Sequence, residues 1–168
     1  MPTSNLAVAP LVLWYVEEVE HEHVLDVGPG WGKYAVLLRE YLNTKPRRVD
    51  AVELHEPYVD AHRLRVLYDD VLVGDVLDLT DEQLAAYDLV LMVDVIEHLN
   101  KQPALDLLAR IPGRVVACTP VTFFSNGPGL PESETHRSHW TIADFAGTGR
   151  LERHEQQHGG LVVRLAPR

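Results

Sequence analysis

The chain has 168 residues, a hydrophobic fraction of 46% and a formal net charge of −10, and its mean hydropathy is −0.10. These values predict one domain with a packed core, spanning residues 1–168, and no run approaches the roughly 20 apolar residues that a membrane span needs. The acidic balance argues against a nucleic acid as partner, because nucleic-acid binders usually carry a basic patch.

The first predicted element is a helix over about residues 6–20. Pro10 interrupts its apolar part and no basic segment precedes it, so it makes a poor signal peptide. We therefore expect a cytoplasmic protein with no membrane partner.

A strand over about 23–28 and a helix over about 32–43 flank three glycines, Gly28, Gly30 and Gly32. Glycine permits positive φ and lets a ligand approach the bare backbone. The helix start adds free N–H groups and the positive end of its dipole. The stretch therefore predicts a site for a carboxylate, a phosphate or a ribose. The dinucleotide fingerprint needs its third glycine one position further on, where this chain has a lysine.

Three further apolar runs predict strands at about 48–54, 71–75 and 88–93, with a helix at 57–67 and a short capped helix at 80–83 between them. An acid stands at or near the end of each run: Glu53, Asp75 and Asp94. Glu53 follows the glycine loop at about 20 residues, the spacing at which a carboxylate reaches ribose hydroxyls. Taken singly, each acid can equally be a turn residue.

The next predicted elements are a helix at 102–110, a turn at 111–113, a strand at 114–119 and an irregular segment at 120–140. A helix from Thr141 follows, and then two strands near 150–157 and 160–166 that are joined by Gly159-Gly160. The alternation of strands and helices predicts βαβ units around a parallel sheet, which brings the strand ends to one edge. The irregular segment is long for a compact domain, so we expect a lid or acceptor loop there.

The pattern Asp26-x-Gly28-x-Gly30-x-Gly32 resembles motif I of the class I S-adenosyl-L-methionine (SAM)-dependent methyltransferases. Residues 94–99, Asp-x-x-Glu-His-Leu, resemble the fourth motif of their small-molecule members. The resemblance implies an α/β fold with a doubly wound, mostly parallel sheet of order 3-2-1-4-5-7-6, a C-terminal antiparallel hairpin and helices on both faces.

The same resemblance implies SAM as cofactor and S-adenosyl-L-homocysteine (SAH) as product. It assigns the methionine part of SAM to the glycine loop, its amino group to Asp26, and the adenine to Asp75 and Val76. The strand order brings Glu53, matched above to the ribose, and Asp94 into the same crevice. The methyl acceptor is expected to be a small molecule, methylated on oxygen or nitrogen.

Three histidines are candidate general bases for a hydroxyl acceptor, namely His98, His136 and His139. A side chain with a pKa near 6.5 is well suited to remove a proton at neutral pH. Arg137 can clamp an acidic substrate or form a surface salt bridge. Residues 136–141 resemble a His-x-Ser-x-Trp-Thr element found after strand five in some bacterial methyltransferases. A purely structural interpretation is that Thr141 with Asp144 caps a helix and Trp140 fastens the loop to the core.

The alternatives are a non-catalytic SAM-binding module, an aminopropyltransferase and an NAD oxidoreductase. No metal site is expected, because none of the nine histidines forms a metal-spaced pair with the single cysteine. That residue, Cys118, lies in an apolar run and is expected to be buried and inert. The sequence leaves the oligomeric state open.

Overall fold

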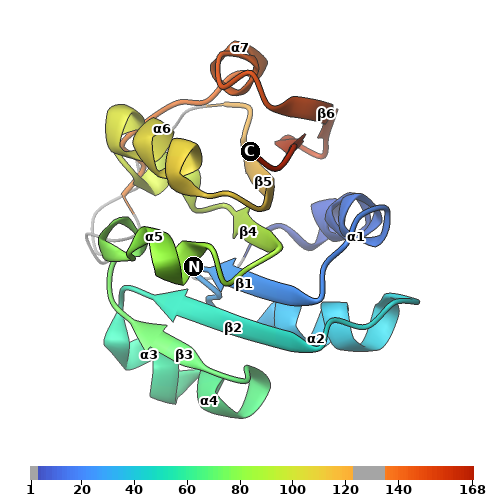
Figure 1. Ribbon diagram of the computed structural model, residues 1–168, viewed down its shortest axis with the longest axis vertical. Coiled ribbons are helices and arrows are strands. Elements are labelled where there is room, and N and C mark those ends of the chain that lie inside the picture. The colour runs from blue at the N-terminus through green and yellow to red at the C-terminus, as the bar shows by residue number, and fades with distance from the viewer. Residues whose placement is uncertain (1–3, 123–134) are drawn as a thin grey trace.

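The computed structural model describes residues 4–122 and 135–168. In this part of the chain a seven-stranded sheet has the order β3-β2-β1-β4-β5-β7-β6 (Figure 1). The strands are β1 His23–Val27, β2 Arg48–Glu53, β3 Val71–Val73, β4 Leu89–Val93, β5 Arg114–Pro120, β6 Leu151–Gln157 and β7 Gly160–Leu165. The first five are parallel, and β7 pairs antiparallel with both β5 and β6. The strand order and the C-terminal hairpin implied by the family resemblance are thereby confirmed.

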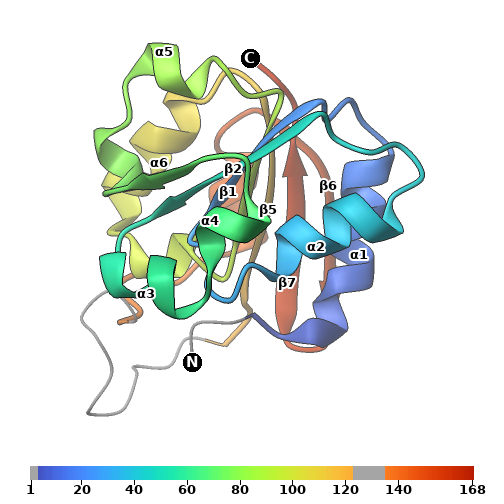
Figure 2. The same cartoon turned by 90° about the horizontal axis from the view of Figure 1, so that it is seen from below.

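The helices cover both faces of this sheet. They are α1 Ala9–Glu17, α2 Lys33–Tyr41, α3 Glu56–Ala61, α4 Leu64–Leu67, α5 Asp81–Leu84, α6 Lys101–Arg110 and α7 Ile142–Ala146, with 3-10 turns η1 Leu6–Val8, η2 Val76–Asp78 and η3 Ile96–His98. Helices α1, α2 and α4 lie on one face, and α5 and α6 lie on the other (Figures 1 and 2). Each face has its own buried apolar cluster. Because both faces are covered, a central strand such as β4 is buried at every position and reads as an unbroken apolar run.

Two local predictions differ from the structure. The helix expected at 57–67 is split into α3 and α4, because Arg63 adopts a left-handed conformation with φ 55°. The hairpin turn consists of His158 and Gly159, whose φ values of 50° and 82° suit a tight turn between twisted strands. Gly160 is already part of β7, where a Cβ atom would lie 3.0 Å from the Cys118 sulfur.

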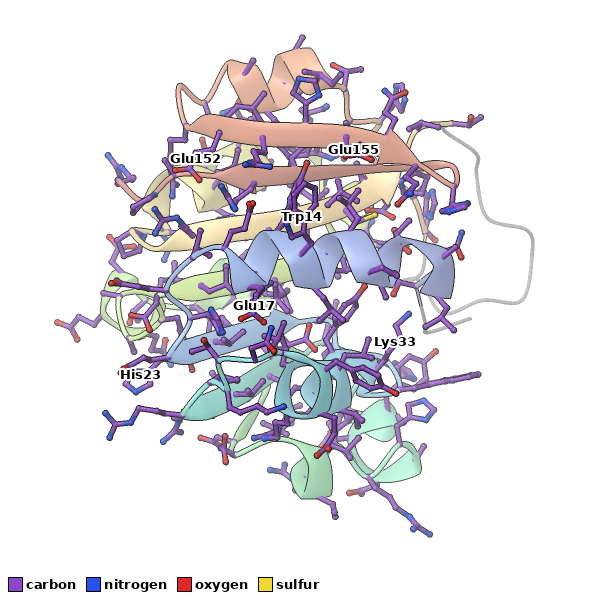
Figure 3. The ribbon with its side chains drawn as sticks, turned by 90° about the vertical axis from the view of Figure 1, so that its right-hand side faces the viewer. Trp14, Glu17, His23, Lys33, Glu152 and Glu155 are labelled. Atoms are coloured by element: carbon purple, nitrogen blue, oxygen red, sulfur yellow. The ribbon has the colours of Figure 1, made fainter. Side chains whose placement is uncertain are left out.

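The ends of the sheet are distinct. Figure 3 shows His23, at the start of β1, and Lys33, at the start of α2, at opposite ends of the molecule. In the same view α1 lies across the sheet, with Trp14 on the side of β6. The carboxyl ends of the parallel strands therefore meet on the side of Lys33. No helix among the described residues has the length and apolar character to cross a membrane.

Candidate functional site

A cavity of about 390 Å³ opens at the carboxyl edge of the parallel strands. Strands β1 and β4 are sheet neighbours although they are distant in sequence, so the chain reverses its winding direction there. In open α/β sheets ligands bind at such a point. Nine of the residues proposed from the sequence line the cavity: Asp26, Gly28, Gly30, Glu53, Asp75, Val76, Asp94, His98 and His136.

The glycine loop joins β1 to α2 with three positive φ angles. Gly28 and Gly30 have φ values of 61° and 55° and line the cavity. A Cβ atom on Gly28 would lie 2.8 Å from a methyl group of Val95, so this position has no room for a side chain. Gly32, the N-cap residue of α2, is not among the lining residues; its added Cβ would meet Leu67 at 2.4 Å. Packing against Leu67 thus explains why a glycine stands at position 32. Contact between Gly32 and a cofactor stays a prediction.

Asp26 is a buried carboxyl group at the floor of the cavity, with 2% of its surface exposed. The hydroxyl of Tyr68 donates a hydrogen bond of 2.5 Å to it. Burial raises the pKa of Asp26 from 3.8 to about 7, despite this hydrogen bond. Such a group is poised to accept a cationic ligand, since a nearby positive charge would restore the carboxylate.

The acid that ends β2 and the acid that follows β3 each accept a hydrogen bond from a nearby backbone N–H. Glu53 is 5% exposed, and its carboxylate accepts a hydrogen bond of 2.7 Å from the N–H of His55. Asp75 accepts one of 2.9 Å from the N–H of Leu77 and so caps η2, which begins with the buried Val76. These side chains are thereby held at the cavity wall.

Asp94 stands directly after β4 with φ 54°, an uncommon conformation for a residue other than glycine. Its N–H donates a hydrogen bond of 2.8 Å to the carbonyl of Cys118 in β5. Burial raises the pKa of Asp94, and the charges of Lys33 and His136 act in the opposite direction. Residues in such uncommon backbone conformations are often found at binding and active sites.

The imidazoles of His98 and His136 lie side by side, with ring centroids 4.9 Å apart and an interplanar angle of 76°. Both line the cavity, as does Arg137. His139 is not among the lining residues; its Nε2 atom lies 3.2 Å from the carbonyl oxygen of Val121. Of the three candidate bases, the structure therefore brings two together.

The helix cap expected after the loop is confirmed. The Asp144 carboxylate accepts hydrogen bonds of 2.7 and 2.8 Å from the N–H and hydroxyl of Thr141. Trp140 is 1% exposed, packs on Phe145 and lies under the Lys101 ammonium. Of the lid or acceptor loop predicted at 120–140, residues 123–134 lie outside the described part of the chain.

Sequence reasoning missed several residues that line the cavity. Lys33 is half-buried and donates a hydrogen bond of 2.7 Å from its Nζ to the carbonyl of Ser4. Its position just after the third glycine, in the first turn of α2, could have indicated from the sequence that it lies at the cavity. Glu97 is 2% exposed and was noted only as part of a motif. Tyr58 on α3 had no signal, because only the fold brings it to the cavity.

Comparisons with known proteins agree with this geometry. A family model described as "Methyltransferase domain" matches residues 24–115, and a search of curated proteins finds no significant match. Among solved structures, the PH0226 protein from Pyrococcus horikoshii OT3 is 16% identical with a TM-score of 0.69, covering 96% of this chain and 88% of that one. The methyltransferase domain of bacterial CtHen1-CN is 19% identical with a TM-score of 0.68, over 98% and 100% of the chains. The N-terminal domain of EvdMO1, crystallised in the presence of SAH and D-fucose, is 13% identical with a TM-score of 0.68, over 99% and 85%.

Proposed function

From the premise that this chain belongs to the methyltransferase-domain family, we propose that it transfers the methyl group of SAM to a hydroxyl or amine of a small-molecule acceptor. The observation that carries the proposal is one cavity lined by the glycine loop and by four acids from successive strand ends. These acids are Asp26, Glu53, Asp75 and Asp94.

The wall of the cavity suits the parts of SAM. Gly28 and Gly30 leave the backbone bare for the methionine moiety, and buried Asp26 can accept hydrogen bonds from its ammonium group. The Glu53 carboxylate can accept hydrogen bonds from both ribose hydroxyls. Asp75 and Val76 would read the edge of the adenine. The SAH present with the EvdMO1 domain supports the same cofactor here.

The acceptor would enter beside Asp94, His98 and His136, which line the same cavity. Asp94 and His98 follow β4, on the other side of β1 from β2 and β3, the strands that end near Glu53 and Asp75. The sulfonium supplies an already activated methyl group, so the protein mainly has to align the acceptor atom with it. The paired imidazoles can orient a hydroxyl and take part in removing its proton. His139 is kept as a weaker candidate, because it contacts Val121 instead of the cavity.

The proposed acceptor is a small molecule and not a nucleic acid. The net charge of −10 opposes long-range attraction of a phosphate backbone. The cavity volume of about 390 Å³ lies within the range of small-molecule sites.

Calorimetric titration of the purified chain with SAM, SAH and NADH tests the donor half. We expect SAM and SAH to bind and NADH not to bind. Binding of NADH would indicate the oxidoreductase alternative. A screen of hydroxyl and amine compounds, scored by SAH release, tests the reaction. SAM binding with no turnover across that screen would favour the non-catalytic SAM-binding module.

Replacing Glu53 by Ala is expected to weaken SAM binding by about 1.5–3 kcal/mol, the usual contribution of hydrogen bonds to a charged group. Such a loss corresponds to a Kd raised roughly 10- to 150-fold. Calorimetry on Glu53→Ala measures it, with Glu40→Ala, an exposed acid on α2, as the matched control. An unchanged Kd in Glu53→Ala would remove the ribose assignment.

A further inference from the structure

Three potential metal ligands converge in the acceptor half of the cavity. One donor atom each from Glu97, His98 and His136 lies within 4.8 Å of the other two. Glu97 and His98 belong to η3, whereas His136 follows the long segment after β5. The cluster is therefore a product of the fold and not of one sequence motif.

Glu97 is the unusual member of this cluster. Its side chain is 2% exposed, and among the described residues neither carboxylate oxygen has a hydrogen bond of standard geometry, although the Thr119 side chain lies close to it. A buried carboxyl group without a partner is costly, and a bound cation is one of the few ways to compensate it.

The backbone holds the second histidine in place beside the first. The carbonyl of Glu97 accepts hydrogen bonds of 2.7 and 3.0 Å from the N–H groups of Arg137 and Ser138. The hydroxyl of Ser138 donates one of 2.8 Å to the carbonyl of Leu99. The indole N–H of Trp140 donates one of 3.2 Å to the carbonyl of Ile96. His136 is thus tied to η3 by the residues that follow it, which orders the donor atoms before any ligand arrives.

We propose that Glu97, His98 and His136 bind a divalent transition-metal ion of the zinc type, facing the acceptor half of the cavity. Two imidazole nitrogens and one carboxylate oxygen favour zinc-type ions over Mg²⁺ and Ca²⁺, which prefer oxygen ligands throughout. Three protein ligands leave at least one coordination position open for water or substrate, as in catalytic zinc sites. The adjacent Asp94 adds negative charge that favours a cation. This proposal departs from the expectation of no metal, which considered only sequence spacing.

The ion would select a hydroxyl as the accepting group. A hydroxyl bound to the ion loses its proton to water more readily, because the ion lowers its pKa. The resulting oxygen forms the new O–C bond while the S–C bond of the sulfonium breaks, and SAH leaves with the electron pair on sulfur. This role rests on the proposed methyl transfer, whereas the binding of the ion does not.

The binding test uses the full chain after removal of metals with a chelator. Calorimetric titration with Zn²⁺, and titration with Co²⁺ followed by visible absorption, are expected to show one ion per chain. Glu97→Gln, His98→Ala and His136→Ala are each expected to weaken binding by at least tenfold. His154→Ala, an exposed histidine on β6, is the matched control and should bind as the unaltered chain does. Circular dichroism establishes that each variant is folded.

Three outcomes would overturn the proposal. One is no Zn²⁺ binding to the unaltered chain, and another is binding that persists in the Glu97, His98 and His136 variants. The third, full SAH formation by the chelated protein, would overturn the role of the ion in methyl transfer and return His98 and His136 to the role of general bases without metal. SAM affinity measured on the same chelated protein separates this proposal from the previous one. No SAM binding by either the chelated or the Zn²⁺-loaded protein would contradict the proposed methyl transfer, while retained SAM binding with no Zn²⁺ binding would contradict only the ion site.

Discussion

Replacing Asp26 by Asn is expected to stabilise the protein without ligand at pH 8 and to leave its stability nearly unchanged at pH 4. The folded pKa of Asp26, about 7, lies above the reference value of 3.8. Between these pH values the folded state binds more protons than the unfolded state, so the free energy of unfolding falls as the pH rises. The full loss above pH 7 is at most about 4 kcal/mol, from 1.36 kcal/mol per pKa unit. Asparagine does not titrate and can still accept the hydrogen bond from Tyr68.

Urea unfolding of the unaltered chain and of Asp26→Asn between pH 4 and pH 8 measures this difference. Asp60→Asn, an exposed acid on α3, is the control and should show a constant difference across the range. A difference between Asp26→Asn and the unaltered chain that does not vary with pH would contradict the raised pKa. The same variant should bind SAM roughly tenfold more weakly or worse, since it lacks the charge that pairs with the ammonium group. The Asp26 carboxylate would then destabilise the ligand-free protein and at the same time strengthen the binding of SAM.

Trp140→Ala is expected to lower the free energy of unfolding by about 3–5 kcal/mol, the usual cost of removing a buried aromatic side chain. The indole is 1% exposed, packs on Phe145 and lies 4.0 Å from the Lys101 ammonium, measured to the ring centroid. Its N–H also donates hydrogen bonds to Ile96 and Ser138. The variant therefore loses packing and the contacts that attach this segment to η3.

Denaturant unfolding followed by far-ultraviolet circular dichroism measures the loss without relying on tryptophan emission. Trp14→Ala provides a matched control, because Trp14 is 48% exposed and should cost about 1 kcal/mol or less. The loss of unfolding free energy in Trp140→Phe should lie between those of Trp140→Ala and Trp14→Ala, since phenylalanine keeps most of the packing and lacks the N–H donor. A cost for Trp140→Ala as small as that for Trp14→Ala would contradict the anchoring role of this side chain.

Most of the fold could be predicted because its elements carry local signals. Buried parallel strands such as β4 appear as unbroken apolar runs, and the capping box of α5 pairs Thr80 with Gln83 over three positions. The misjudged elements depend on tertiary contacts. The left-handed Arg63 and the turn at His158-Gly159 are set by the packing and twist around them, which no local pattern records.

The gathering of Asp26, Glu53 and Asp75 at one edge of the sheet follows from the sequence alone. Each of these residues stands near the end of a parallel strand, so strand order suffices to bring them together. The physical reason is that parallel strands joined by right-handed crossovers share the direction in which they end.

The placement of the candidate histidines was decided by tertiary structure. His136 and His139 are close in sequence and equally good candidates, yet only His136 lies against His98. The difference comes from the hydrogen bonds of Arg137 and Ser138 to the carbonyl of Glu97, which fix the direction of a segment without regular structure. Sequence periodicity describes only elements that repeat, so the path of such a segment, and the Glu97–His98–His136 cluster it creates, can be known only from the folded chain.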